Sequence, residues 1–205
     1  KIGEIIGELN GNHFPDTVLS SLERDARILS SHSSTSIEGN LLPLTDVKKI
    51  LKSTPENIRD SEREVLNYNE ALLYIHKKLK EKQSLKIDNK LICRIQEKVM
   101  DKLPGKNASL EYRSEPVFVN NPIKREIVYL PPDVKDVQPL MNDLVEFISR
   151  GKDVIDPLIV AGIFHKQFVI IHPFIDGNGR TVRIITKAIL AQLGIDTFQL
   201  FSFEN

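Results

Sequence analysis

Apolar positions recur every three or four residues along most of the chain, which is the spacing of amphipathic helices. The pattern predicts helices over residues 18–36, 46–51, 57–82, 90–103, 134–149, 158–171 and 181–193. The segment 158–171 is apolar on nearly every side, and such a helix is usually central and buried. We therefore expect a bundle of helices around this one.

Several residues mark where these helices should begin and end. Thr45 and Asp88 stand where an N-cap is expected, and Asp156 combines an N-cap position with a proline directly after it. Gly39 should end the first helix, and Gly194 should cap the last one.

Two short runs of β-prone residues, 116–119 and 127–130, interrupt the helical pattern. Residues 120–122, Asn-Asn-Pro, supply turn chemistry between them. A two-stranded hairpin is barely stable alone in water, so we expect it to lie against the helices. The sequence thus predicts a mainly α fold with one β-hairpin flap.

Composition narrows the classes of function. The 28 Lys and Arg residues balance 28 Asp and Glu residues, so a broad basic surface for nucleic acid or anionic lipid loses support. The longest apolar stretch, residues 158–164, is too short to span a bilayer. A single cysteine, Cys93, and the lack of any segment resembling a signal peptide favour a cytoplasmic location. Without repeats or linkers, residues 1–205 are expected to form a single domain.

The densest chemistry lies between the last two predicted helices. His172 ends the first of them and is the one side chain there that titrates near neutrality, which makes it a candidate general base. Gly177 and Gly179 allow backbone amides to approach an anion at the start of the next helix. Arg180 and Arg183, three residues apart, add two guanidinium groups that suit a polyphosphate.

Asp176 adds a hard oxygen ligand to the same loop, and Mg²⁺ typically binds one or two carboxylates together with substrate phosphates. The loop contains neither the Lys-Ser/Thr pair of a Walker loop nor a dinucleotide fingerprint after a strand. The residues alone leave two interpretations open. The segment is either a phosphate site or an ordinary Gly-Asn-Gly turn beside a structural histidine.

Residues 172–183, His-Pro-Phe-Ile-Asp-Gly-Asn-Gly-Arg-Thr-Val-Arg, resemble the full signature of Fic domains, the protein AMP-transferases. His165-x-x-Phe168, Tyr112-Arg113 and the end of the predicted hairpin also resemble the core of that family. The resemblance runs from about residue 15 to the C-terminus. It implies a Fic-type helical bundle whose catalytic core covers about residues 56–205.

The resemblance implies a role for each residue of the signature. His172 would deprotonate a hydroxyl of a target protein, which then attacks the α-phosphate of ATP, and Asp176 would hold Mg²⁺ on the phosphates. The remaining residues would position the phosphates of ATP: Gly177, Asn178, Gly179, Arg180 and Arg183. Phe174 would anchor the loop in the core. The implied partners are ATP and a protein with a Ser, Thr or Tyr hydroxyl, this chain itself included.

A second motif lies far upstream, where Ser34 and Glu38 are four residues apart on one face of a predicted helix. One interpretation is a Ser-rich helix end capped by Gly39. The pattern Ser-x-x-x-Glu-Gly also resembles the inhibitory helix of Fic proteins that carry it N-terminal to the core, here within about residues 15–55. A pair between Glu38 and Arg183 would then misplace the phosphates of ATP. A misalignment that costs about 3 kcal/mol slows transfer about a hundredfold.

Three hypotheses follow from the sequence. The first is a protein adenylyltransferase restrained by its own Glu38. The second is removal of AMP, or transfer of another phosphate-containing group, on the same fold. The third is a non-enzymatic regulatory or toxin–antitoxin binding module. The edge of the hairpin either holds an extended target segment or only covers the core, and a homodimer is left open.

Overall fold

The computed structural model describes residues 4–5, 7–8, 15–81, 85–103, 110–120, 126–195 and 204. In chain order its helices are α2 (Asp16–Ile37), α3 (Leu44–Lys52), α4 (Asp60–Lys80), α5 (Asn89–Met100), α6 (Val134–Gly151), α7 (Pro157–Ile171) and α8 (Asn178–Gln192). The strands β1 (Val119–Asn120) and β2 (Ile127–Tyr129) form an antiparallel pair between α5 and α6. The fold is mainly helical with a hairpin, as the sequence predicts. Within the described ranges, no helix is both long enough and apolar enough to cross a membrane.

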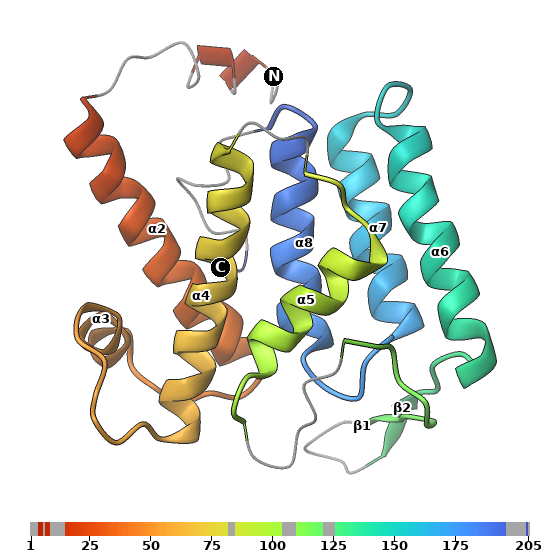
Figure 1. The fold of residues 1–205 in the computed structure, drawn as a ribbon, viewed down its shortest axis with the longest axis horizontal. Helices are drawn as coiled ribbons and strands as arrows, with labels where there is room; N and C mark the ends of the chain where they lie inside the picture. The colour runs from red at the N-terminus through yellow and green to blue at the C-terminus, as the bar shows by residue number, and fades with distance from the viewer. Residues whose placement is uncertain are drawn as a thin grey trace.

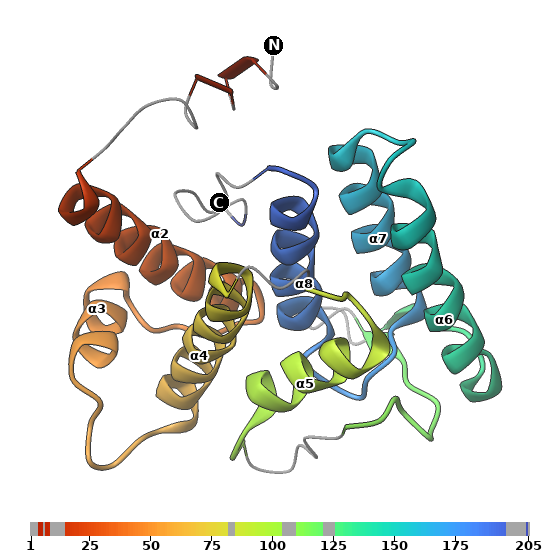
Figure 2. The same ribbon diagram turned by 45° about the horizontal axis from the view of Figure 1, so that its top comes forward.

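Helix α8 lies at the centre of the bundle, between α4 and α7 (Figures 1 and 2), and it also contacts α2 and α5. Nearly every residue from Asn178 to Leu190 is buried. The prediction that segment 158–171 is the central helix is wrong, because α7 leaves Leu158 and Ile159 exposed on its outer face. The sequence of α8 did not indicate this central position, because α8 contains polar residues whose side chains are buried against polar partners from other helices.

Helix α2 lies outside the apolar core and is attached to the bundle in a different way from the other helices. The core cluster is built from residues of α4, α5, α6, α7, α8 and the segments that join them, and it includes no residue of α2. Helix α2 instead buries one alanine and a set of small hydroxyl side chains: Ser30, Ser31, Ser33, Ser34 and Thr35. Helix α2 is therefore attached to the bundle mainly through polar contacts.

Some predicted caps are present and others are not. The side chain of Asp88 accepts from the backbone of Leu91 at 2.9 Å, and Asp156 caps α7 in the same way. Gly194 follows the end of α8 and its amide donates to the carbonyl of Ala191, as the sequence predicts. The N-cap of α3 is Pro43 rather than Thr45, because the extended backbone that proline favours already lies two residues earlier.

The hairpin is shorter than predicted. Of the run 116–119, Val119 alone pairs with β2, and the register shifts by one residue between Val119 and Asn120. The hydroxyl of Tyr129 in β2 donates to the carbonyl of Ile170 at 2.9 Å, which fixes the hairpin to the C-terminal end of α7. The turn residues 121 and 122 lie outside the described residues.

Candidate active site

The signature loop leaves α7 through a backbone conformation that few residues adopt. His172 closes the helix with φ 50° and ψ 60°, in the left-handed region. Two residues later, Phe174 turns into the core, where it is 2% exposed and its ring lies 5.3 Å from that of Tyr112 and 6.3 Å from that of Phe168. The predicted anchoring of the loop by Phe174 is therefore confirmed by its contacts.

Asn178 shapes the loop from within. The backbone amide of Phe174 donates to Asn178 Oδ1 at 2.9 Å, and Asn178 Nδ2 donates to the carbonyl of Phe174 at 2.7 Å. Gly177 between them has φ +79°, and a Cβ there would lie 2.8 Å from the sulfur of Met100. This turn starts α8 at Asn178, three residues earlier than the sequence predicts. Both polar ends of the Asn178 amide are used in the loop, and a phosphate contact by this residue stays a prediction.

Arg113 holds the other side of the loop. Sequence reasoning named it as part of the Tyr112-Arg113 pair that resembles the family core, but assigned it no role. Its Nε donates to the carbonyl of His172 at 2.9 Å, and its backbone amide donates to the carbonyl of Pro173 at 2.8 Å. Its Nη2 donates to the carbonyl of Pro132 at 2.6 Å, so one guanidinium joins the loop to the segment after the hairpin. The signal for such a role was weak, because an arginine in an irregular segment has no informative spacing.

Burial sets the chemistry of His172. It lowers the pKa of the imidazole below its ordinary value of 6.5, and the positive charge of Arg113 acts in the same direction. A backbone hydrogen bond with Val169 and the carboxylates of Asp176 and Glu38 partly oppose this shift. The ring is therefore neutral at pH 7 and able to accept a proton, as a general base must.

Arg183 on α8 is held by α2. Its Nε donates to Ser34 Oγ at 2.7 Å, and its Nη2 donates to the carbonyl of Ser34 at 2.9 Å. The same Nη2 lies 2.7 Å from Glu38 Oε1 and forms an ion pair with it. The structure thus brings the upstream motif and the signature together at Arg183, in the pair that the resemblance implies.

The end of α2 directs Glu38 at the loop. Gly39, with φ +94°, donates to the carbonyl of Ser36 at 2.9 Å, and Asn40 donates to that of Thr35 at 3.1 Å. This turn makes Glu38 the C-cap residue, directly after Ile37, so the interpretation as a capped Ser-rich helix end is confirmed, while an inhibitory role stays a prediction. A Cβ on Gly179 would lie 2.2 Å from Glu38 Oε1, so the carboxylate fills the space over the first turn of α8. That is the place where a helix favours an anion.

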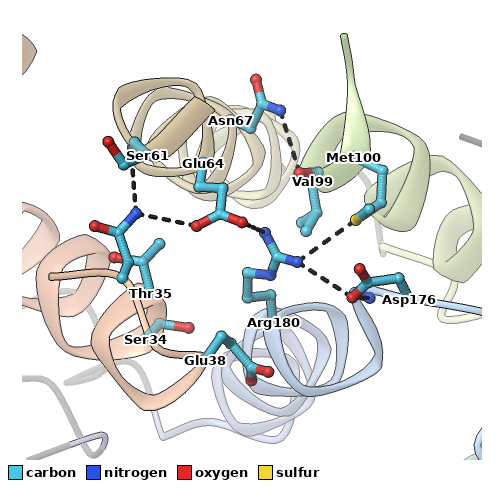
Figure 3. Close-up of polar contacts among 12 residues, drawn as sticks. Ser34, Thr35, Glu38, Ser61, Glu64, Asn67, Val99, Met100, Asp176 and Arg180 are labelled. Atoms are coloured by element: carbon cyan, nitrogen blue, oxygen red, sulfur yellow. Dashed lines mark hydrogen bonds and ion pairs between the residues drawn. The ribbon is translucent and has the colours of Figure 1, made fainter. Parts of the chain in front are cut away.

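Arg180 takes a different direction from Arg183. It is 2% exposed, and its Nη2 lies 3.4 Å from Asp176 Oδ1 while its Nη1 lies 3.5 Å from Oε1 of Glu64 on α4 (Figure 3). Its Nη2 also contacts the sulfur of Met100 at 3.7 Å. The two guanidinium groups that the sequence places over one polyphosphate therefore point to different neighbours in this structure. A phosphate contact by Arg180 stays a prediction.

Asp176 is the carboxylate that the loop offers to a metal ion. Its Oδ1 accepts from the backbone amide of Gly177 and faces Arg180. In the part of the chain that the structure describes, no group of three or more His, Cys, Asp or Glu side chains could hold a metal. A single carboxylate still meets the need of Mg²⁺ when substrate phosphates complete its shell, so Asp176 fits an ion that arrives with a nucleotide.

Comparisons with known proteins agree with this geometry. The model of the Fic/DOC family matches residues 86–190. A curated relative, Protein adenylyltransferase Fic from Nematostella vectensis, is 32% identical over 176 residues, which is 83% of this chain and 39% of the relative. The chain spans about two fifths or less of the length of the curated relatives it matches.

Solved structures show the same fold. A Fic domain containing signaling protein from Bacteroides thetaiotaomicron superposes with a TM-score of 0.80 at 21% identity, over 92% of this chain and 73% of that one. Fic-1 from C. elegans gives a TM-score of 0.78 at 24% identity, over 96% of this chain and 59% of that one. At this identity the likeness concerns the architecture.

Proposed function

The chain belongs to the Fic/DOC family, and on that premise we propose that it transfers AMP from ATP to a hydroxyl side chain of a protein. Curated relatives carry the name protein adenylyltransferase Fic, which supports this activity. The observation that carries the proposal is His172, a half-buried histidine with a lowered pKa at the start of a loop whose far end is the N-terminus of α8.

The chemistry follows from the position of these groups. His172 takes the proton of the target hydroxyl, and the hydroxyl oxygen attacks the α-phosphorus of ATP. The bond from the α-phosphorus to the oxygen that leads to the β-phosphate breaks, and pyrophosphate leaves. The amides in the first turn of α8 stabilise negative charge on the phosphates. Asp176 would hold Mg²⁺, which neutralises phosphate charge when bound.

We infer that Glu38 restrains this reaction. Its carboxylate is paired with Arg183 and fills the space over Gly179, where a phosphate would otherwise be favoured. The γ-phosphate and Glu38 therefore compete for one guanidinium and one helix terminus. ATP that binds beside Glu38 has misplaced phosphates, and transfer is slow.

The hairpin supports a protein as the acceptor. Ile127 and Val128 of β2 are 56% and 59% exposed, and Phe118 before β1 is 55% exposed. Apolar side chains on a short strand pair suit an extended target segment that adds to the strand edge. Such docking would bring a target hydroxyl toward the end of α7, where Tyr129 fixes the hairpin.

Labelled nucleotides test the reaction directly. The Glu38→Gly variant is incubated with Mg²⁺, a cell lysate and ATP labelled at the α- or the γ-phosphate. Label is expected on protein from α-labelled ATP only, and adding His172→Ala should reduce it by about 10²- to 10⁴-fold because the general base is gone. Label from γ-labelled ATP would identify phosphoryl transfer instead, and label from neither would refute the proposed function.

A further inference from the structure

Glu64 of α4 lies between the two motifs and belongs to neither of them. Its Oε1 is 3.5 Å from Arg180 Nη1 (Figure 3). Its Oε2 accepts from Asn40 Nδ2 at 3.0 Å. We propose that Glu64 is a positioning residue, which keeps Arg180 from closing on Asp176 and so preserves the Asp176 carboxylate for a Mg²⁺ ion that arrives with ATP. The inference rests on the nucleotide site of the proposed function.

The burial of Arg180 makes a second carboxylate necessary. A cation that is 2% exposed needs nearby negative charge, and Glu64 and Asp176 lie at almost equal distances of 3.5 and 3.4 Å. If Glu64 were neutral, Asp176 would be the one charged carboxylate left of these two. Arg180 would then be attracted toward Asp176. An Asp176 carboxylate that neutralises a guanidinium is a poorer ligand for a cation.

Asn40 holds the carboxylate of Glu64 in place. It is 9% exposed, and its Nδ2 also donates to the carbonyl of Ser61 at 2.8 Å while its Oδ1 accepts from the amide of Leu42 at 3.1 Å. Asn40 lies two residues after Glu38, the C-cap residue of α2. The position of Glu64 is therefore tied to the segment that ends the inhibitory helix, and Glu64 connects this segment with Arg180.

A double-mutant cycle tests the inference in the Glu38→Gly background. The affinity for ATP is measured by calorimetry with and without Mg²⁺, for the parent and for the Glu64→Gln, Arg180→Gln and doubly substituted proteins. Glu64→Gln should reduce the gain in affinity that Mg²⁺ provides by about tenfold. In the Arg180→Gln background, Glu64→Gln should not reduce this gain further, because position 180 then has no guanidinium that Asp176 could attract.

Two further variants separate positioning from general stability. Glu64→Asp keeps the charge and should recover most of the Mg²⁺ effect, even if it unfolds at a lower temperature. Glu70→Gln, the same change at an exposed position of α4, is the matched control. A Mg²⁺ effect in Glu64→Gln within twofold of that in Glu70→Gln would overturn the inference, as would equal losses in both Arg180 backgrounds or a parent that gains nothing from Mg²⁺. Transfer of AMP is scored in the same samples, so failure of the proposed function is seen separately from these affinities.

Discussion

Helix α8 meets α7 and α2 through surfaces of opposite character. Toward α7 the contact is mainly apolar, with Phe164 and Phe168 both 0% exposed in the core, beside one polar contact of 3.0 Å between His165 Nδ1 and Thr186 Oγ1. Toward α2 it consists of hydroxyl groups and charges, as in the contacts of Arg183 with Ser34 and Glu38. A buried apolar side chain contributes roughly 1.5–3 kcal/mol, a neutral hydrogen bond about 1 kcal/mol net, and a hydrogen bond to a charged group about 1.5–3 kcal/mol. Because α7 belongs to the apolar core and α2 does not, we expect the α7 contact to maintain the fold and the fold to persist when the α2 contact is weakened.

The contact between α8 and α2 is made specific by the arrangement of its polar groups. Lys187, one turn after Arg183, forms a 3.0 Å ion pair with Glu204 and contacts Ser30 of α2. Ser30 and Tyr68 also donate to the same Glu204 oxygen, at 2.8 and 2.9 Å. Burial lowers the pKa of Lys187, and Glu204 opposes this shift. These contacts constrain the alignment of α2, because a shift of the helix would leave buried polar groups without their partners.

The largest effect is expected on the apolar side. Phe164→Ala should lower the free energy of unfolding by about 3–5 kcal/mol, because it leaves a cavity in the core. Urea denaturation measures this loss. Leu158→Ala, on the exposed face of the same helix, is the control and should lower the free energy far less. Equal losses in the two variants would contradict the assignment of α7 as the apolar support of α8.

A smaller loss is expected on the polar side, together with a gain in transfer. Ser34→Ala removes the hydrogen bond to Arg183 Nε, which is worth about 1.5–3 kcal/mol for a charged donor. The fold should persist and AMP transfer should rise severalfold, since Arg183 is held less firmly. Initial rates and denaturation are measured on the same protein, with Ser36→Ala at an exposed position of α2 as control. A Ser34→Ala protein that is less stable but no faster would argue against a releasable α2.

The smallest effect concerns pH. Because burial lowers the pKa of His172, transfer should rise as the pH increases through a value below 6.5 and should then level off. The negative charge of Glu38 raises this pKa slightly, so Glu38→Gly should move the rise to a still lower pH. Rate profiles of both proteins between pH 5 and 8 measure the shift. A rise centred above pH 6.5 would exclude the half-buried His172 as the base.

Sequence reasoning reached the parts of the site that depend on local spacing. The residues from His172 to Arg183 and the step from Ser34 to Glu38 carried the resemblance to Fic proteins, and this resemblance implied the pair between Glu38 and Arg183. Fold class and most helices followed from apolar periodicity, although the central helix was misassigned because α8 buries charged residues.

Contacts that depend on the fold alone could not be found in this way. Glu64 is one carboxylate among many along α4, and nothing in its spacing connects it with Arg180, more than a hundred residues away. The same holds for Arg113, whose partners are backbone carbonyls and carry no sequence signal. Long-range partners of buried charges therefore required the structure.

The claim that a carboxylate at position 38 withholds Arg183 and the N-terminus of α8 from the phosphates is tested by changing that side chain alone. Initial rates of AMP transfer are compared for Glu38, Glu38→Gln and Glu38→Gly with the same ATP and Mg²⁺. The rate should rise about a hundredfold from Glu38 to Glu38→Gly, the effect of a misalignment of about 3 kcal/mol. Glu38→Gln should lie between them, because it keeps the shape without the charge. Equal rates for Glu38 and Glu38→Gly, in a protein whose transfer still requires His172, would contradict it.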